Sequence, residues 1–152
     1  MYRILVIDDE DEVRAGVRRR LERAGFEVTT AETANEGIEL IKKEEPFDVI
    51  VTDMSIEDPE AGLRILTAAF TVDLLAEVIV MTAYGNVANA VECMRRGAYD
   101  YIEKNQPGVD TYEILIMKIE QAMEQRRHDM RAVQRWERAA RAQEKRLAER
   151  EA

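Results

Sequence analysis

Three acids, a threonine and a lysine stand at or just after the ends of short apolar runs. These residues are Asp8, Asp9, Asp53, Thr82 and Lys104. Carboxylates placed close together repel one another, and proteins tolerate such a set where a cation offsets the charge. Oxygen ligands without His or Cys favour Mg²⁺ over zinc. If the apolar runs end at one place in the fold, the sequence predicts an acidic Mg²⁺ site there.

Phosphoryl chemistry accounts for the other members of this set. Mg²⁺ in proteins takes one or two carboxylates together with phosphate oxygens. Lys104 is suited to neutralise phosphoryl oxygens as a point charge, and the Thr82 hydroxyl to donate a hydrogen bond to one of them. Asp53 is the candidate nucleophile, in the chemistry that forms aspartyl phosphates.

The elements that must position these residues alternate along the chain. Buried strands are predicted from β-branched runs at 4–7, 48–52, 77–81 and 98–102, with a weaker one at 26–31. Helical periodicity appears between them, as at 12–24 and 35–45. This order predicts an α/β fold with a doubly wound, five-stranded parallel sheet. With strand order 2-1-3-4-5, the five polar residues meet at the carboxyl edge, where such sheets bind ligands.

The sequence after Gly108 contains neither Gly nor Pro and predicts one long helix from about Asp110. Its apolar heptad seam weakens beyond Val133. We expect the first turns to pack on the domain and the remainder to project as an exposed helix or a frayed tail. The predicted division is a domain over 1–122 and a charged helical extension or linker over 123–152. Trp136, on an otherwise polar helix, suggests a contact with a partner or within a dimer.

Charge and composition narrow the function. Residues 1–117 hold 12 Lys or Arg against 24 Asp or Glu, and residues 118–152 hold 10 against 7. An acidic body argues against nucleic-acid binding, and the interleaved acids of the tail favour a solvated, salt-bridged helix. No run is apolar enough to predict a membrane span, and the start carries no signal-peptide pattern. With Cys93 as the only cysteine, a cytoplasmic protein is the simplest expectation.

Four stretches resemble the response-regulator receiver domains (CheY-like) of two-component signalling, which have a flavodoxin-like fold. They are Ile4–Glu10, Val49–Asp53, Val78–Gly85 and Gly97–Lys104. Each stretch alone is weakly specific, but together they occur in the family's order and at its spacing. The resemblance covers roughly residues 2–122.

The resemblance implies a role for each matching residue. Asp8 and Asp9 become Mg²⁺-binding acids, together with Asp53 and the backbone carbonyl of Ser55. Asp53 becomes the phosphorylated residue, which Lys104 and the switch hydroxyl of Thr82 contact. Tyr101 becomes the aromatic switch residue that turns inward when Thr82 is drawn to the phosphate.

The implied partners are a histidine kinase or phosphotransfer protein and a downstream protein. A homodimer through the fifth helix or the tail stays open. The domain is expected to catalyse only its own phosphorylation and dephosphorylation, not turnover of another substrate.

One departure from the family lies just after Asp53. The loop to Gly62 is about one residue longer than usual, and Glu57, Asp58 and Glu60 make it more acidic. We expect this loop to affect phosphodonor approach or Mg²⁺ affinity.

Two other functions are alternatives to the hypothesis of a receiver domain. An aspartate-nucleophile phosphatase or phosphotransferase also uses Mg²⁺ and acids at strand ends, but such enzymes usually carry a second acid two residues after the nucleophile, where this chain has Ser55. A degenerate receiver that binds partners without phosphate is disfavoured by the complete set of acids, Thr82 and Lys104.

Overall fold

A parallel β-sheet forms the centre of the computed structural model, which describes residues 1–54, 60–83 and 88–151. Five strands lie in these ranges: β1 (Arg3–Ile7), β2 (Glu27–Ala31), β3 (Val49–Asp53), β4 (Glu77–Ala83) and β5 (Asp100–Lys104). Their order across the sheet is β2-β1-β3-β4-β5, and every neighbouring pair is parallel. The predicted doubly wound fold and strand order are confirmed.

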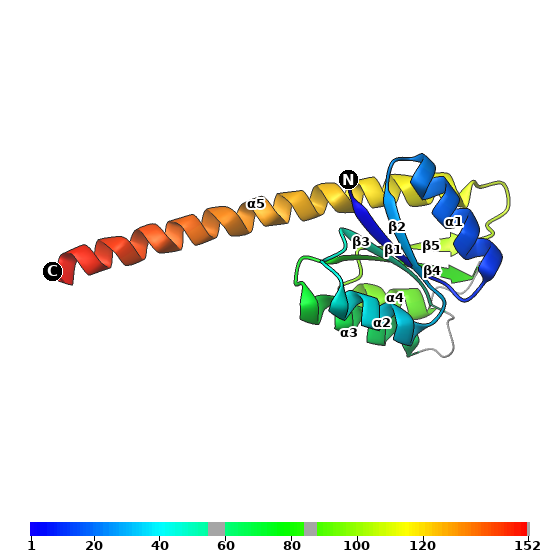
Figure 1. The fold of residues 1–152 in the computed structure, drawn as a ribbon, viewed down its shortest axis with the longest axis horizontal. Helices are drawn as coiled ribbons and strands as arrows, with labels where there is room; N and C mark the ends of the chain where they lie inside the picture. Colours follow the sequence, from blue (N-terminus) through cyan, green and yellow to red (C-terminus); the bar gives the residue numbers. More distant parts are fainter. Residues whose placement is uncertain (55–59, 84–87, 152) are drawn as a thin grey trace.

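Helices cover both faces of the sheet (Figure 1). The described residues contain five: α1 (Asp11–Arg23), α2 (Ala34–Lys43), α3 (Ala61–Val72), α4 (Ala88–Arg95) and α5 (Thr111–Glu151). Helices α2, α3 and α4 share one hydrophobic cluster with the sheet, and α1 and α5 share the other. Because both faces are covered, the strands are apolar on both sides, which explains their unbroken runs of Ile, Leu and Val.

Three strands extend further than their apolar runs. β3 includes Asp53, β4 continues through Thr82 to Ala83, and β5 ends at Lys104, two residues beyond the predicted end. Backbone pairing causes the difference, because Ala83 pairs with Lys104 whatever the polarity of the side chains. Asp53, Thr82 and Lys104 are therefore held by the sheet ladder, whereas Asp8 and Asp9 stand in the turn after β1.

The last helix, α5, is uninterrupted over 41 residues, and only its first part lies on the body (Figure 1). Its buried residues are Leu115, Ile119, Ala122, Met123 and Arg126. From 131 to 151 every residue is exposed except Ala140, which is half-buried. Of the two predicted forms of the tail, the structure shows the exposed helix. No helix among the described residues has both the length and the apolar character needed to cross a bilayer.

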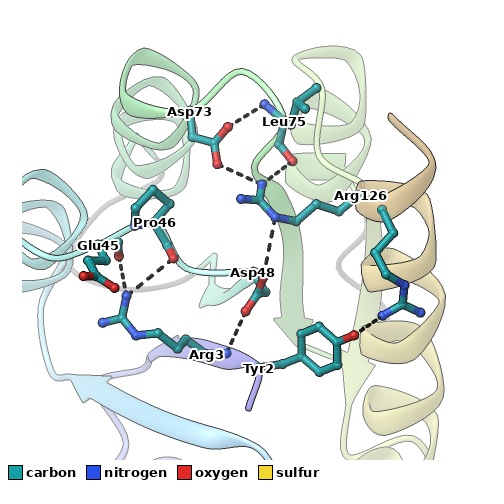
Figure 2. A network of polar contacts seen from close by, with 9 residues as sticks. Tyr2, Arg3, Glu45, Pro46, Asp48, Asp73, Leu75 and Arg126 are labelled. Atoms are coloured by element: carbon teal, nitrogen blue, oxygen red, sulfur yellow. Dashed lines mark hydrogen bonds and ion pairs between the residues drawn. The ribbon is translucent and has the colours of Figure 1, made fainter. Parts of the chain in front are cut away.

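Arg126 binds α5 to the amino edge of the sheet, the edge at which the parallel strands begin (Figure 2). Its Nη1 donates to Asp73 Oδ2 at 2.8 Å and to the Leu75 carbonyl at 2.9 Å, both in the turn between α3 and β4. Its Nε lies 3.6 Å from Asp48 Oδ1, while Asp48 Oδ2 accepts the backbone N–H of Arg3 at 2.8 Å. We refer to Arg126 with Asp48, Asp73 and the Leu75 carbonyl as the Arg126 junction.

The amino end of the chain meets α5 beside this junction. Arg127 donates to the Tyr2 hydroxyl, and its guanidinium carbon lies 5.4 Å from the centre of that ring. Arg3 in turn donates to the carbonyls of Glu45 and Pro46 (Figure 2). Contacts between α5 and the body thus continue to Arg127.

Replacing the buried guanidinium of the junction should destabilise the fold. In Arg126→Met, Asp73 and the Leu75 carbonyl lose their donor, and we expect the free energy of unfolding to fall by about 1–3 kcal/mol. Urea denaturation measures the change. Arg131→Met, on the exposed part of the same helix, is the matched control and should stay within about 0.5 kcal/mol of the parent. Equal stability of the two variants would contradict the assignment.

Candidate functional site

The polar residues singled out in the sequence come together at the carboxyl edge of the sheet. Asp8 follows β1, Asp53 ends β3, Thr82 is the penultimate residue of β4, and Lys104 ends β5. All four are buried, with exposed fractions of 1%, 2%, 1% and 7% respectively. The strand order makes this possible, because β1, β3, β4 and β5 are consecutive neighbours.

The ammonium of Lys104 is the centre of the site. Its Nζ lies 2.8 Å from Asp8 Oδ2 and 3.1 Å from Asp53 Oδ2, and it reaches Glu10 Oε1 at 3.5 Å. Burial on its own would lower the pKa of Lys104 by penalising the charged form. The hydrogen bond to Asp8 and the negative charge of Asp53 outweigh that effect, so the pKa is raised above its ordinary value. Lys104 is therefore a fixed positive charge at neutral pH.

Asp8 is held by partners on four of its atoms. Its backbone N–H donates to the Ala31 carbonyl, and its own carbonyl accepts Arg14 Nη1 at 2.8 Å. Its Oδ1 accepts the backbone N–H of Glu10 at 2.9 Å, and its Oδ2 faces Lys104. These contacts fix the turn between β1 and α1. The adjacent Asp9, which is exposed, is set at the solvent side of the site.

A cation fits this arrangement of oxygen atoms. One carboxylate oxygen from each of Asp8, Asp9, Glu10 and Asp53 lies within 4.8 Å of the others. Two of the acids are buried and two are exposed, so the group opens toward solvent. With carboxylate oxygens as the donors, the set suits a hard cation such as Mg²⁺. Glu10 was not among the metal-binding residues predicted from the sequence. Its position directly after Asp8 and Asp9 could have indicated that it lies near them.

Thr82 and Tyr101 lie on the same face of the sheet. Thr82 shares the side of β4 with Val80, which packs in the cluster of α2, α3 and α4. Tyr101 pairs with Val80 across the ladder, one pleat from Thr82, and packs partly buried against the same cluster. The two residues are therefore neighbours on the α4 side, whereas Lys104 and Asp53 share the parity of Ile102 and Val51 on the other side.

Part of the predicted site lies outside the described residues. Ser55, whose carbonyl is the remaining predicted metal ligand, belongs to the range 55–59, as do Glu57 and Asp58 of the acidic loop. The expected effects of that loop stay predictions. Its far end is described: Glu60 is exposed, and Gly62 lies in α3, where an added Cβ would stand 2.7 Å from Met54 Sδ.

The sequence of this chain is similar to that of known proteins. The family described as response regulator receiver domain matches residues 4–116. The photosynthetic apparatus regulatory protein RegA of Rhodobacter capsulatus is 30% identical over 115 residues, covering 76% of this chain and 61% of RegA. The acid tolerance regulatory protein ActR of Rhizobium meliloti is 32% identical over 142 residues, covering 93% of this chain and 72% of ActR.

Solved structures agree with the sequence comparison. A response regulator receiver domain protein from Clostridium thermocellum superposes with a TM-score of 0.75 at 30% identity, covering 84% of this chain and 98% of that one. The chain spans 61% of RegA, and several longer relatives are matched over only 21% to 26% of their length. The similarity thus concerns one part of those longer proteins.

Removing the Lys104 ammonium should destabilise the fold, because Asp8 and Asp53 then repel each other without a counter-charge. In Lys104→Met, Asp8 and Asp53 stay buried without their counter-charge, and we expect unfolding at neutral pH to become easier by about 3–5 kcal/mol. Because the pKa of Lys104 is raised, its stabilisation is complete below its ordinary value of 10.5 and is lost as the pH rises through the raised value.

Urea unfolding with and without Mg²⁺ tests this expectation, and Mg²⁺ should recover part of the loss. Lys118→Met is the matched control, because Lys118 pairs with Asp100 at a more exposed position. A parental unfolding midpoint for Lys104→Met would disprove the assigned role of the ammonium.

Proposed function

The chain belongs to the response regulator receiver domain family of two-component signalling, and from this we propose that Asp53 is its phosphorylated residue. One observation carries the proposal: Lys104 Nζ bridges Asp53 and Asp8 inside a cluster of four carboxylates at a sheet edge. This is a carboxylate nucleophile beside a fixed positive charge and a cation-binding set. Phosphoryl transfer depends mainly on such positioning and charge stabilisation.

The transfer makes one bond and breaks one. A carboxylate oxygen of Asp53 attacks the phosphorus of a phosphohistidine on a histidine kinase or phosphotransfer protein. The O–P bond forms as the P–N bond breaks, and the histidine nitrogen leaves with its electron pair. Asp8, Asp9, Asp53 and the carbonyl of Ser55 would hold Mg²⁺, which when bound offsets negative charge on the phosphoryl oxygens.

Lys104 changes partners in this scheme. Before transfer its ammonium neutralises Asp8 and Asp53 directly, at 2.8 and 3.1 Å. Phosphorylation of Asp53 to the acyl phosphate removes the carboxylate charge and adds phosphoryl oxygens slightly further out, which then attract the same ammonium. The Thr82 hydroxyl, buried on the neighbouring strand, donates to another of these oxygens.

Signalling follows as a shift between two surfaces. Drawing Thr82 toward the phosphoryl group opens space one pleat away, where Tyr101 packs half-buried against the α4 side of the sheet. An inward Tyr101 changes the face formed by α4, β5 and α5. Phosphorylation stabilises one of two surfaces through differential contacts. A downstream protein would read that face.

The organisation of the chain fits a receiver with an appended helix. We infer a receiver domain over 1–122 and a helical extension or linker over 123–152, in a cytoplasmic protein. A homodimer through α5 is compatible with the exposed Trp136, Val133 and Leu147. Direct nucleic-acid contact is not expected from the acidic body.

Treatment with acetyl phosphate and Mg²⁺ tests the acceptor. The parent protein should gain the mass of one phosphoryl group, resistant to acid and labile to alkali, whereas Asp53→Asn should gain none. Chelating Mg²⁺ should abolish the reaction. Modification of Asp53→Asn, or an unmodified parent, would refute the proposal. Multiple turnover of a generic phosphate ester would instead favour an aspartate-nucleophile phosphatase.

The switch is tested separately from the acceptor. Thr82→Ala should still be phosphorylated but should lose the change in hydrogen exchange at α4 and β5 that beryllofluoride and Mg²⁺ induce in the parent. Thr67→Ala, an exposed threonine of α3, is the matched control and should respond normally. A parental response in Thr82→Ala would exclude Thr82 as the switch residue.

A further inference from the structure

Arg14, in the second turn of α1, binds the backbone of the turn that carries the first acids of the site. Its Nη1 donates to the Asp8 carbonyl at 2.8 Å, and its own backbone N–H donates to the Glu10 carbonyl at 2.9 Å. The side chain is charged and yet only 14% exposed. The proposed phosphorylation chemistry leaves Arg14 without a role.

The second terminal nitrogen of this guanidinium is held by two acids from different segments. Nη2 donates to Asp11 Oδ1 at 2.5 Å, in the first turn of α1, and to Glu32 Oε1 at 3.3 Å, just after β2. Glu32 is tied in turn to α2, because its backbone N–H donates to Glu36 Oε2 at 3.1 Å. The planar fork of Arg14 therefore joins the turn after β1, the start of α1 and the turn after β2.

The backbone of this turn decides where two carboxylates of the site point. Asp8 and Asp9 both branch from it, so a movement of the turn moves both carboxylates. The Asp8 side chain is fixed relative to the turn, because its Oδ1 accepts the Glu10 N–H at 2.9 Å. Glu10 is also the N-cap residue of α1, but its side chain makes no capping hydrogen bond. The contacts of Arg14 are therefore a principal restraint between this turn and the helix that follows it.

We propose that Arg14 is a positioning residue for the Mg²⁺ site. It holds the Asp8 backbone so that the carboxylates of Asp8 and Asp9 stay within the 4.8 Å group of oxygen atoms that suits a cation. Arg14 acts through these acids and not on the cation itself. The inference rests on the proposed function, in which Asp8 and Asp9 are metal ligands. Removing a group that supports metal ligands typically lowers metal affinity by about 10- to 100-fold.

Charge and positioning make opposite predictions for Arg14. The guanidinium is a positive charge bound to the turn that carries Asp8 and Asp9, so its Coulomb effect opposes the binding of a cation there. By charge alone, replacing Arg14 with a neutral residue would strengthen Mg²⁺ binding. Loss of the contacts that position the turn would weaken it. The sign of the change in affinity therefore distinguishes the two effects.

Calorimetric titration of the full chain with Mg²⁺, in the absence of a phosphodonor, tests the inference. In Arg14→Met we expect the affinity for Mg²⁺ to fall by about tenfold, because the turn loses its donor. Arg14→Lys keeps the charge but not the planar fork, and its affinity should lie between those of Arg14→Met and the parent. Arg18→Met is the matched control. It removes an exposed arginine one turn further along α1, paired with Glu22, and should keep the parental affinity.

Phosphorylation by acetyl phosphate gives a second readout of the same variants. In Arg14→Met the Mg²⁺ concentration that gives half the maximal rate should rise by about tenfold. The rate at saturating Mg²⁺ should stay near the parental rate, because Lys104 and Asp53 keep their own contact. A general loss of folded protein would instead reduce the extent of reaction at every Mg²⁺ concentration.

The possible failures of this inference and of the proposed function are distinguishable. Unchanged or tighter Mg²⁺ binding by Arg14→Met, or an equal loss in Arg18→Met, would overturn the role of Arg14 and leave Asp53 as the proposed acceptor. A parent protein that binds no Mg²⁺ would overturn this inference together with the proposed function. If Arg14→Met fails to fold, a parental Mg²⁺ affinity in Arg14→Lys overturns the inference.

Discussion

The ion pairs of Lys104 with Asp8 and Asp53 are the interaction on which the carboxyl edge of the sheet depends. Two carboxylates that are almost fully buried cannot both stay ionised without a compensating charge close by. The strand ladder places Lys104 at this edge, because β5 continues in register with β4 through Lys104, and the chain then turns at Asn105, whose φ is 57°. The pairing of β5 with β4 therefore helps to position the counter-charge of the site.

Charge is balanced differently at the two ends of the sheet. At the carboxyl edge, Lys104 neutralises part of an acidic cluster that stays open to a cation. At the amino edge, Arg126 donates to Asp73 and approaches Asp48, and burial raises the pKa of Glu77 to about 7. A basic side chain thus lies beside carboxylates at each end of the sheet, and at the carboxyl edge the carboxylates also form a metal-binding geometry.

Local sequence patterns predicted the elements well because the strands are buried on both faces and the helices have one apolar side. The meeting of Asp53 and Lys104 at one edge of the sheet was also predictable, since the topology brings the strand ends together. The strand ends were less predictable, because polar residues extend the ladder when a neighbouring strand pairs with them. The contacts of Arg126 could not be predicted from local sequence patterns. Its partners Asp73 and Asp48 lie 53 and 78 positions earlier in the chain, and only folding brings them near Arg126.

The long helix connects these observations. Its body-facing residues, among them Leu115, Ile119 and Ala122, form an apolar stripe that would by itself permit some sliding or rolling of the helix on the sheet. Arg126 ends that stripe with directional hydrogen bonds to a turn, which specify one orientation. β4 begins at Glu77 beside this anchor and carries Thr82 near its other end. β4 therefore contains Thr82, the residue proposed to respond to the phosphoryl group, and begins next to the turn that binds Arg126 and orients α5.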